Sequence, residues 1–169
     1  MAIRKYPLPS RERGNRVEGE GPLTDAKGAY LLVITLEKPL LIALPGRPPA
    51  MLSPGLYAYC GSAYGPGGLK ARVARHLRAD KPQRWHVDRL TAVGSVSAVA
   101  LAPSGRECDL FERVRALPGT DVPVPGFGSS DCRRCAAHLA RLPEDFDPGR
   151  DTPSAAYWIM NLRSDEKVG

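Results

Sequence analysis

Apolar runs between residues 28 and 142 predict a small sheet. The run at 30–36 is rich in β-branched residues and too short for a helix, so it predicts a buried strand. Shorter runs at 40–44 and 55–59 are bounded by Pro and Gly residues and predict two further strands. The run at 93–102 predicts a fourth strand.

Helical spacing follows the third and fourth strands. Leu69, Val73 and Leu77 recur every four residues, which predicts a helix from Leu69. A second helix is predicted from Ser104, and its apolar face consists of Leu110, Phe111, Val114 and Leu117. Capping chemistry at Ser129 predicts a last helix at 129–142. We therefore expect an α/β fold of the α+β type: a small, mainly antiparallel central sheet flanked by helices.

Length and composition indicate one folded domain with extensions. The chain has 169 residues, of which 43% are hydrophobic, and its 17 Gly and 17 Pro exclude a coiled coil. We expect a flexible N-terminal extension at 1–27, a domain at 28–143 and an acidic C-terminal tail at 144–169. Neither an apolar run long enough to span a membrane nor a signal peptide is evident, so we expect a cytoplasmic protein with no membrane partner.

The charge distribution predicts a nucleic-acid partner. The formal net charge is +6, and most of the excess lies between Ser62 and Leu90. The basic residues of that segment are Lys70, Arg72, Arg75, Arg78, Lys81, Arg84 and Arg89. Trp85 and Tyr64 lie in the same segment and are suited to stacking on bases. Protein partners are left open by this pattern.

Three short motifs occur in a characteristic order. Gly28-Ala29-Tyr30 comes first, Tyr59-Cys60-Gly61-Ser62 second, and Arg72 with His76 four residues later on the predicted helix third. In this order they resemble the GIY-YIG nuclease superfamily. Later motifs, including Trp85-His86-Val87-Asp88, look like an uncharacterised branch of it that is sometimes fused to repair glycosylases of the endonuclease III type.

The resemblance implies a metal-dependent endonuclease that cleaves DNA or RNA, with DNA favoured and DNA repair as a setting. The catalytic residues it implies are Tyr30, Tyr59, Arg72, His76 and Glu107, with Mg²⁺ or Mn²⁺ held by Glu107. The expected nucleic-acid contacts are Lys70, Arg75, Arg78, Arg84, Trp85 and His86. The departures are Ala29 and Cys60 in place of the usual isoleucines, and a long separation between the two tyrosines. A nucleic-acid-binding module without catalysis is the alternative.

Two glutamates of the second predicted helix compete as the metal ligand. On a helical wheel Glu107 falls on the apolar face and Glu112 on the opposite one. An inward carboxylate is costly unless it is paired or metal-bound, which favours Glu107. Ser104 to Glu107 also forms a capping-box pattern, so closing the helix start is its alternative role. Glu112 has Arg115 three residues later and is expected to form a solvated pair.

The cysteines allow two interpretations. Cys132, Cys135 and His138 have the spacing of a zinc site, with His86 or Cys108 as a fourth ligand. The preferred explanation is an apolar helical stripe in which buried cysteines act as small hydrophobes. A zinc nucleobase deaminase is a further alternative, but Asp88 stands where its motif needs glutamate.

Overall fold

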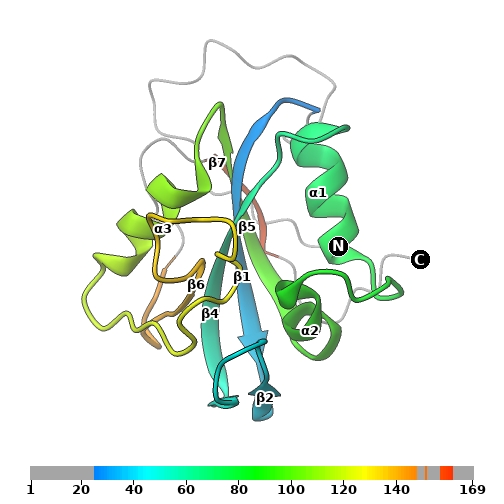
Figure 1. Cartoon of the computed structure of the whole chain (residues 1–169). Coiled ribbons are helices and arrows are strands. Elements are labelled where there is room, and N and C mark those ends of the chain that lie inside the picture. The colour runs from blue at the N-terminus through cyan, green and yellow to red at the C-terminus, as the bar shows by residue number, and fades with distance from the viewer. Residues whose placement is uncertain (1–24, 148–150, 152–156, 162–169) are drawn as a thin grey trace.

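A five-stranded antiparallel sheet organises the chain (Figure 1). The structure is a computed structural model that describes residues 25–147, 151 and 157–161. The strand order is β6-β4-β1-β5-β7. These strands are β1 (Gly28–Leu36), β4 (Gly55–Ser62), β5 (Ser95–Pro103), β6 (Leu139–Arg141) and β7 (Tyr157–Asn161). Each neighbouring pair is antiparallel, so the expected fold class is confirmed.

The central strand β1 is buried on both faces of the sheet. Tyr30 and Leu32 point into one core, and Leu31 and Val33 point into a second core on the opposite face. A strand covered on both sides needs apolar residues at every position, which explains why this run has no polar alternation. In the pairing with β4, Tyr59 stands opposite Leu32, so Tyr59 shares the face of Tyr30.

Helices cover both faces of the sheet (Figure 1). The helices α1 (Gly68–Leu77) and α2 (His86–Val93) pack on the face that carries Tyr30. Helix α3 (Glu107–Arg115) packs on the other face through Phe111 and Val114. The predicted helix from Leu69 is thus confirmed as α1. The second helix starts later than predicted, because Ser104 has a φ of 59° and a turn precedes Arg106.

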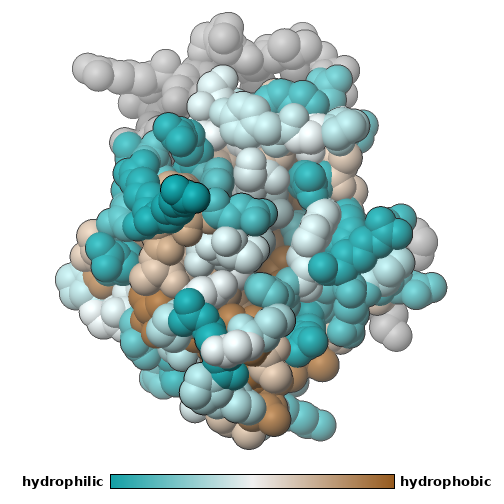
Figure 2. Space-filling model, in the orientation of Figure 1, coloured by the Kyte–Doolittle hydropathy of each residue, from teal (hydrophilic) through white to brown (hydrophobic). Residues whose placement is uncertain are grey.

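A two-stranded ribbon closes one end of the molecule. It pairs β2 (Leu40–Ile42) with β3 (Ala50–Leu52). Ile42 and Leu52 are buried in the core, whereas the directly paired Leu41 and Met51 are exposed. Hydrophobic side chains are accordingly visible at the lower end of the space-filling view, where the ribbon lies (Figure 2).

The predicted last helix at 129–142 is wrong. Residues 129–138 contain no helix, and β6 occupies 139–141. Backbone hydrogen bonds tie Gly126 to Ala136 and Phe127 to His138, which folds the segment back on itself as a loop. These long-range contacts override the local capping signal, since secondary structure follows tertiary pairing where the two conflict.

The sequence predicts extensions at both ends of the chain, and the structure describes only part of them. Residues 1–24 of the N-terminal extension lie outside the described residues. Strand β7 belongs to the segment expected as an acidic tail, yet it pairs with β5. Among the described residues, no helix has the length and apolar character needed to cross a membrane.

Candidate functional site

A hydrogen bond joins the central strand to helix α1 inside the core. The Tyr30 hydroxyl lies 2.7 Å from Nε2 of His76, and both residues are buried. Gly61 stands opposite Tyr30 on β4, and a Cβ atom at that position would overlap the Tyr30 ring. The glycine therefore makes the room that the Tyr30 side chain needs across the sheet face.

His76 is neutral at pH 7. Burial, helped by nearby Lys81, lowers the pKa of His76 to about 4. Its Nδ1 lies 4.0 Å from Oδ1 of Asp88 and has no hydrogen-bond partner among the described residues. A carboxylate on that side favours the tautomer with the proton on Nδ1. Nε2 is then free to accept the hydrogen bond of the Tyr30 hydroxyl.

Tyr59 lies beside the Tyr30–His76 pair and nearer to solvent. Its ring centre is 6.4 Å from that of Tyr30 and 6.3 Å from that of His76. Tyr30 is 2% exposed, whereas Tyr59 is half-buried. Burial raises the pKa of both tyrosines, so their hydroxyls stay protonated at neutral pH. After burial, Cys60 and Asp88 are the larger causes that raise the pKa of Tyr59, whereas Arg72 lowers it and Glu107 raises it least.

Two arginines of α1 stack on Trp85. The guanidinium carbon of Arg72 lies 4.6 Å from the centre of the Trp85 ring, and that of Arg75 lies 3.9 Å from it. The ring of Trp85 also lies 5.7 Å from that of His76, and Trp85 is 37% exposed. Cations are attracted to the face of an indole. The indole therefore helps to hold Arg72 at the rim of the tyrosine and histidine cluster.

Asp88 is a fully buried carboxylate that joins α1 to α2. Arg75 donates to both its oxygens at 2.8 and 2.9 Å. The backbone N–H groups of Arg84 and Trp85 also donate to Oδ2. Burial alone would raise the pKa of Asp88, but these four hydrogen bonds and the Arg75 charge lower it to about 2. The positive charge of Arg75 is therefore balanced by Asp88 within the fold.

Glu107 is the first residue of α3 and is half-buried. The capping box expected from Ser104 is not formed, because the N-cap is Arg106 and no side chain caps this helix. The alternative structural role of Glu107 is therefore absent. The other candidate, Glu112, pairs with Arg115 at 3.1 Å in an exposed position, so the predicted solvated pair is confirmed.

The remaining residues expected to contact nucleic acid fall into two groups. Lys70 on α1, Arg78 at the end of α1 and Arg84 before α2 are exposed. His86 is half-buried instead, and its Nδ1 accepts a hydrogen bond from the backbone N–H of Gly128 at 3.2 Å. Its ring also packs against Phe127. His86 is therefore engaged within the fold by the loop that precedes β6.

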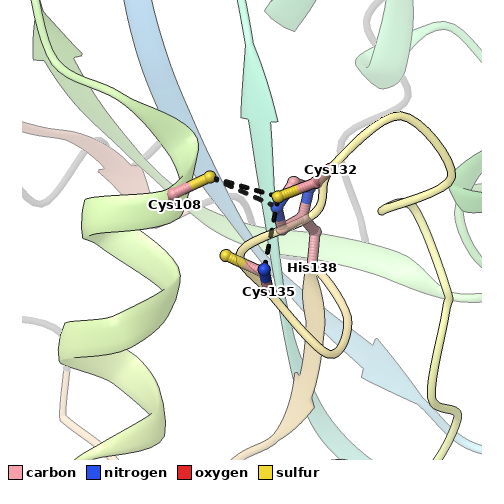
Figure 3. Close-up of side chains that lie close together, drawn as sticks. All are labelled: Cys108, Cys132, Cys135 and His138. Carbon is pink, nitrogen blue, oxygen red and sulfur yellow. Dashed lines mark hydrogen bonds between the residues drawn. The ribbon is translucent and has the colours of Figure 1, made fainter.

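Three cysteines and a histidine converge between α3 and the loop before β6 (Figure 3). The Sγ atoms of Cys108, Cys132 and Cys135 and a ring nitrogen of His138 all lie within 4.8 Å of one another. This cluster could hold a metal ion. Of the two fourth ligands considered from the sequence, Cys108 is in the cluster and His86 is not. The ligand set of the deaminase motif is therefore not assembled.

Sequence patterns missed one participant of the site. Asp88 appeared in the Trp85-His86-Val87-Asp88 motif and as the mismatched residue of a deaminase motif but was given no role, although it holds Arg75 and faces His76. Its position three residues after Trp85, at the start of a helix, is the signal that could have identified it as a helix cap.

A comparison with protein families matches residues 29–157 to the domain of unknown function DUF123. Searches of curated proteins and of solved structures found no match.

Proposed function

The chain belongs to the DUF123 family, a domain of unknown function, and we propose that it is a metal-dependent endonuclease that hydrolyses phosphodiester bonds of DNA or RNA. One observation carries the proposal. The Tyr30–His76 hydrogen bond, the Tyr59 ring 6.3 Å from His76, and the Arg72 guanidinium stacked on Trp85 lie together on the α1 face of the sheet. The resemblance of the motifs to the GIY-YIG nuclease superfamily supports the same assignment.

Arg72 and Tyr59 are the groups placed to contact the substrate. Hydrolysis adds the hydroxyl of water to phosphorus and transfers the water proton to the leaving oxygen, while negative charge grows on the phosphoryl oxygens. Arg72 is partly exposed and has no carboxylate partner among the described residues, so its guanidinium is suited to binding a phosphate. The protonated Tyr59 hydroxyl orients the attacking water.

Tyr30, His76 and Asp88 act as positioning residues in this proposal. All three are buried, and a hydrogen bond and a close electrostatic contact connect them in series. Because Asp88 is fixed by Arg75, it fixes the tautomer of His76, and His76 in turn holds the Tyr30 ring beside Tyr59. The network thereby sets the geometry at the Tyr59 hydroxyl.

Glu107 is the residue that would hold the divalent metal, Mg²⁺ or Mn²⁺. Mg²⁺ is bound through one or two carboxylates together with water and substrate phosphate oxygens, so a single half-buried glutamate fits this need. The absence of a capping role leaves the carboxylate available. When bound, such an ion stabilises negative charge on the phosphoryl and leaving oxygens.

A cleavage assay tests the proposal directly. The protein is incubated with Mg²⁺ or Mn²⁺ and a panel of branched, nicked, single-stranded and duplex DNA and RNA. We expect cleavage of at least one substrate, and its loss on addition of EDTA. Binding of the panel without cleavage under any metal would contradict the enzyme and leave a nucleic-acid-binding module.

Replacing the exposed basic residues Lys70, Arg78 and Arg84 by alanine should weaken binding to all sequences alike. Each phosphate contact contributes about 0.9 to the slope of log affinity against log salt on duplex DNA. The magnitude of this slope should therefore fall by up to about 2.7 in the triple variant. Fluorescence anisotropy at several salt concentrations measures the slope. Arg75 is excluded from the set, because it pairs with Asp88.

The matched control removes three exposed charges elsewhere, at Lys38, Arg47 and Arg113. Both triple variants lower the net charge equally, so a general charge effect would change their slopes to the same extent. Equal slopes in the two variants would show that binding is not centred on α1 and the segment after it.

A further inference from the structure

We propose that Cys108, Cys132, Cys135 and His138 bind a structural Zn²⁺ ion. The four side chains come from two segments that are distant in sequence: Cys108 from the first turn of α3, and the other three from the end of the loop before β6 (Figure 3). Their ligand atoms all lie within 4.8 Å of one another. The inference is independent of the nuclease proposal.

The spacing of the ligand atoms suits tetrahedral zinc. With Zn–S bonds of about 2.3 Å, two sulfurs of a tetrahedron are about 3.8 Å apart. The Sγ atoms of Cys108 and Cys132 are 3.6 Å apart, and Sγ of Cys108 lies 3.8 Å from Nε2 of His138. An ion at the centre therefore needs only small side-chain adjustments.

The surroundings of the ligands match those of metal-bound thiolates and imidazoles. The backbone N–H of Cys135 donates to Sγ of Cys132 at 3.3 Å, which stabilises negative charge on that sulfur. The ring of His138 also packs against the Phe111 ring of α3, with the ring centres 6.0 Å apart, which restricts the orientation of the imidazole.

The donor set selects the ion and its role. Thiolate sulfur prefers Zn²⁺ to the hard ions Mg²⁺ and Mn²⁺, which take oxygen ligands. Four protein ligands fill a tetrahedral site and leave no position for water or substrate, so the zinc is structural rather than catalytic.

The site explains how a loop without helix or strand is held against the sheet. Residues 129–138 lack regular secondary structure, yet Cys135 and Ala137 are buried in the core on the α3 side. Zinc would cross-link this loop to the start of α3. The free energy of zinc binding would stabilise the folded loop in addition to its backbone hydrogen bonds. Because Glu107 precedes Cys108, the same cross-link would also fix the first turn on which Glu107 lies.

Metal analysis of the full-length protein tests the inference. Purified in reducing buffer, it should contain about one zinc per chain by mass spectrometry, and replacement by Co²⁺ should give the visible absorption of a tetrahedral thiolate complex. Serine at Cys108, Cys132 or Cys135 should weaken zinc binding by more than the roughly 100-fold that an outer-shell change costs. Cys60→Ala is the matched control, since Cys60 is buried in the same core but outside the cluster.

Three results would overturn the site: a wild-type protein that takes up neither zinc nor cobalt, a Cys60→Ala variant that loses metal as readily as the cluster variants, or a Cys108–Cys132 disulfide in the reduced preparation. If the serine variants fail to fold, the wild type still decides, because a chelator should release its zinc and expose three further thiols to a thiol reagent. Zinc without cleavage would leave this inference intact and remove only the nuclease.

Discussion

Glu107→Gln is expected to lower metal-dependent cleavage by at least about 100-fold, the scale on which removal of one group that stabilises transition-state charge acts. Glutamine keeps the size of the side chain and one acceptor oxygen but loses the charge that attracts a divalent cation. Folding should be unaffected, because Glu107 makes no capping contact in α3. Affinity for nucleic acid in EDTA should also be unchanged. Cleavage time courses over a range of Mg²⁺ and Mn²⁺ concentrations measure the effect.

Glu112→Gln is the matched control on the same helix. Among the described residues Glu112 pairs with Arg115 alone, at the surface, and such a pair contributes about 0.5 kcal/mol or less. This variant should cleave like the wild type. Equal activity of the two variants would remove Glu107 as the metal ligand, and loss in Glu112→Gln alone would move the site to the exposed face of α3. Zinc content should be unchanged in both, which separates this test from the cysteine cluster.

The hydrophobic pattern of a segment predicts its structure correctly where that pattern matches the burial of its residues. The run at 30–36 is apolar throughout because β1 is covered on both faces, and a strand of that kind has a distinctive sequence. Leu69 and Val73 recur at helical spacing because one face of α1 packs on the sheet. In both segments, the local sequence already contains the information about its surroundings.

The last predicted helix shows where this agreement fails. Cys132 and Cys135 are three residues apart, which is the spacing of a helical face and also that of a Cys-x-x-Cys metal loop. The backbone pairing of Gly126 and Phe127 with this segment, and the contact of its cysteines with Cys108, distinguish the two arrangements. Periodicity within one segment contains no information about such partners.

The candidate site was predictable to a similar extent. The order of motifs indicated Tyr30, Tyr59, Arg72 and His76, which the structure gathers on one face around α1. The electrostatic role of Asp88 was not predictable, because it depends on Arg75, thirteen residues earlier and on a different helix. Local sequence likewise indicated a capping box at Ser104, but the positive φ of that residue prevents it.

Arg75→Ala is expected to destabilise the fold by about 3 to 5 kcal/mol, the cost of leaving a buried charge without its partner. Asp88 is fully buried and receives two hydrogen bonds from the Arg75 guanidinium. Removing the guanidinium leaves the carboxylate with only the N–H groups of Arg84 and Trp85. Urea unfolding followed by circular dichroism measures the change.

Arg78→Ala is the control for loss of a positive charge from the same helix end. Arg78 is exposed and follows the last residue of α1, so its removal should change the free energy of unfolding by no more than about 0.5 kcal/mol. A double variant, Arg75→Ala with Asp88→Ala, should be less destabilised than the sum of the two single variants, because the buried charge is removed together with its partner. Additive losses would show that the two side chains stabilise the fold separately.

The pH dependence identifies the ion pair as the cause. The pKa of Asp88 is depressed to about 2 from its usual 3.8, so its contribution is present above pH 4 and is lost as the pH falls toward 2. His76 changes the free energy of unfolding at higher pH. Its pKa is lowered from 6.5 to about 4, so protonation of the unfolded chain lowers stability as the pH falls from 6.5 to 4. The charged groups that act on His76 are Arg72, Arg75, Lys81 and Asp88, and the first three oppose its protonation.

Without Arg75 the pKa of Asp88 should rise. The deficit of Arg75→Ala, meaning its loss of unfolding free energy relative to the wild type, should therefore be largest near pH 7 and should narrow as Asp88 is protonated. A deficit that stays constant from pH 7 to pH 3 would assign the effect of Arg75 to its packing on Trp85 rather than to its charge.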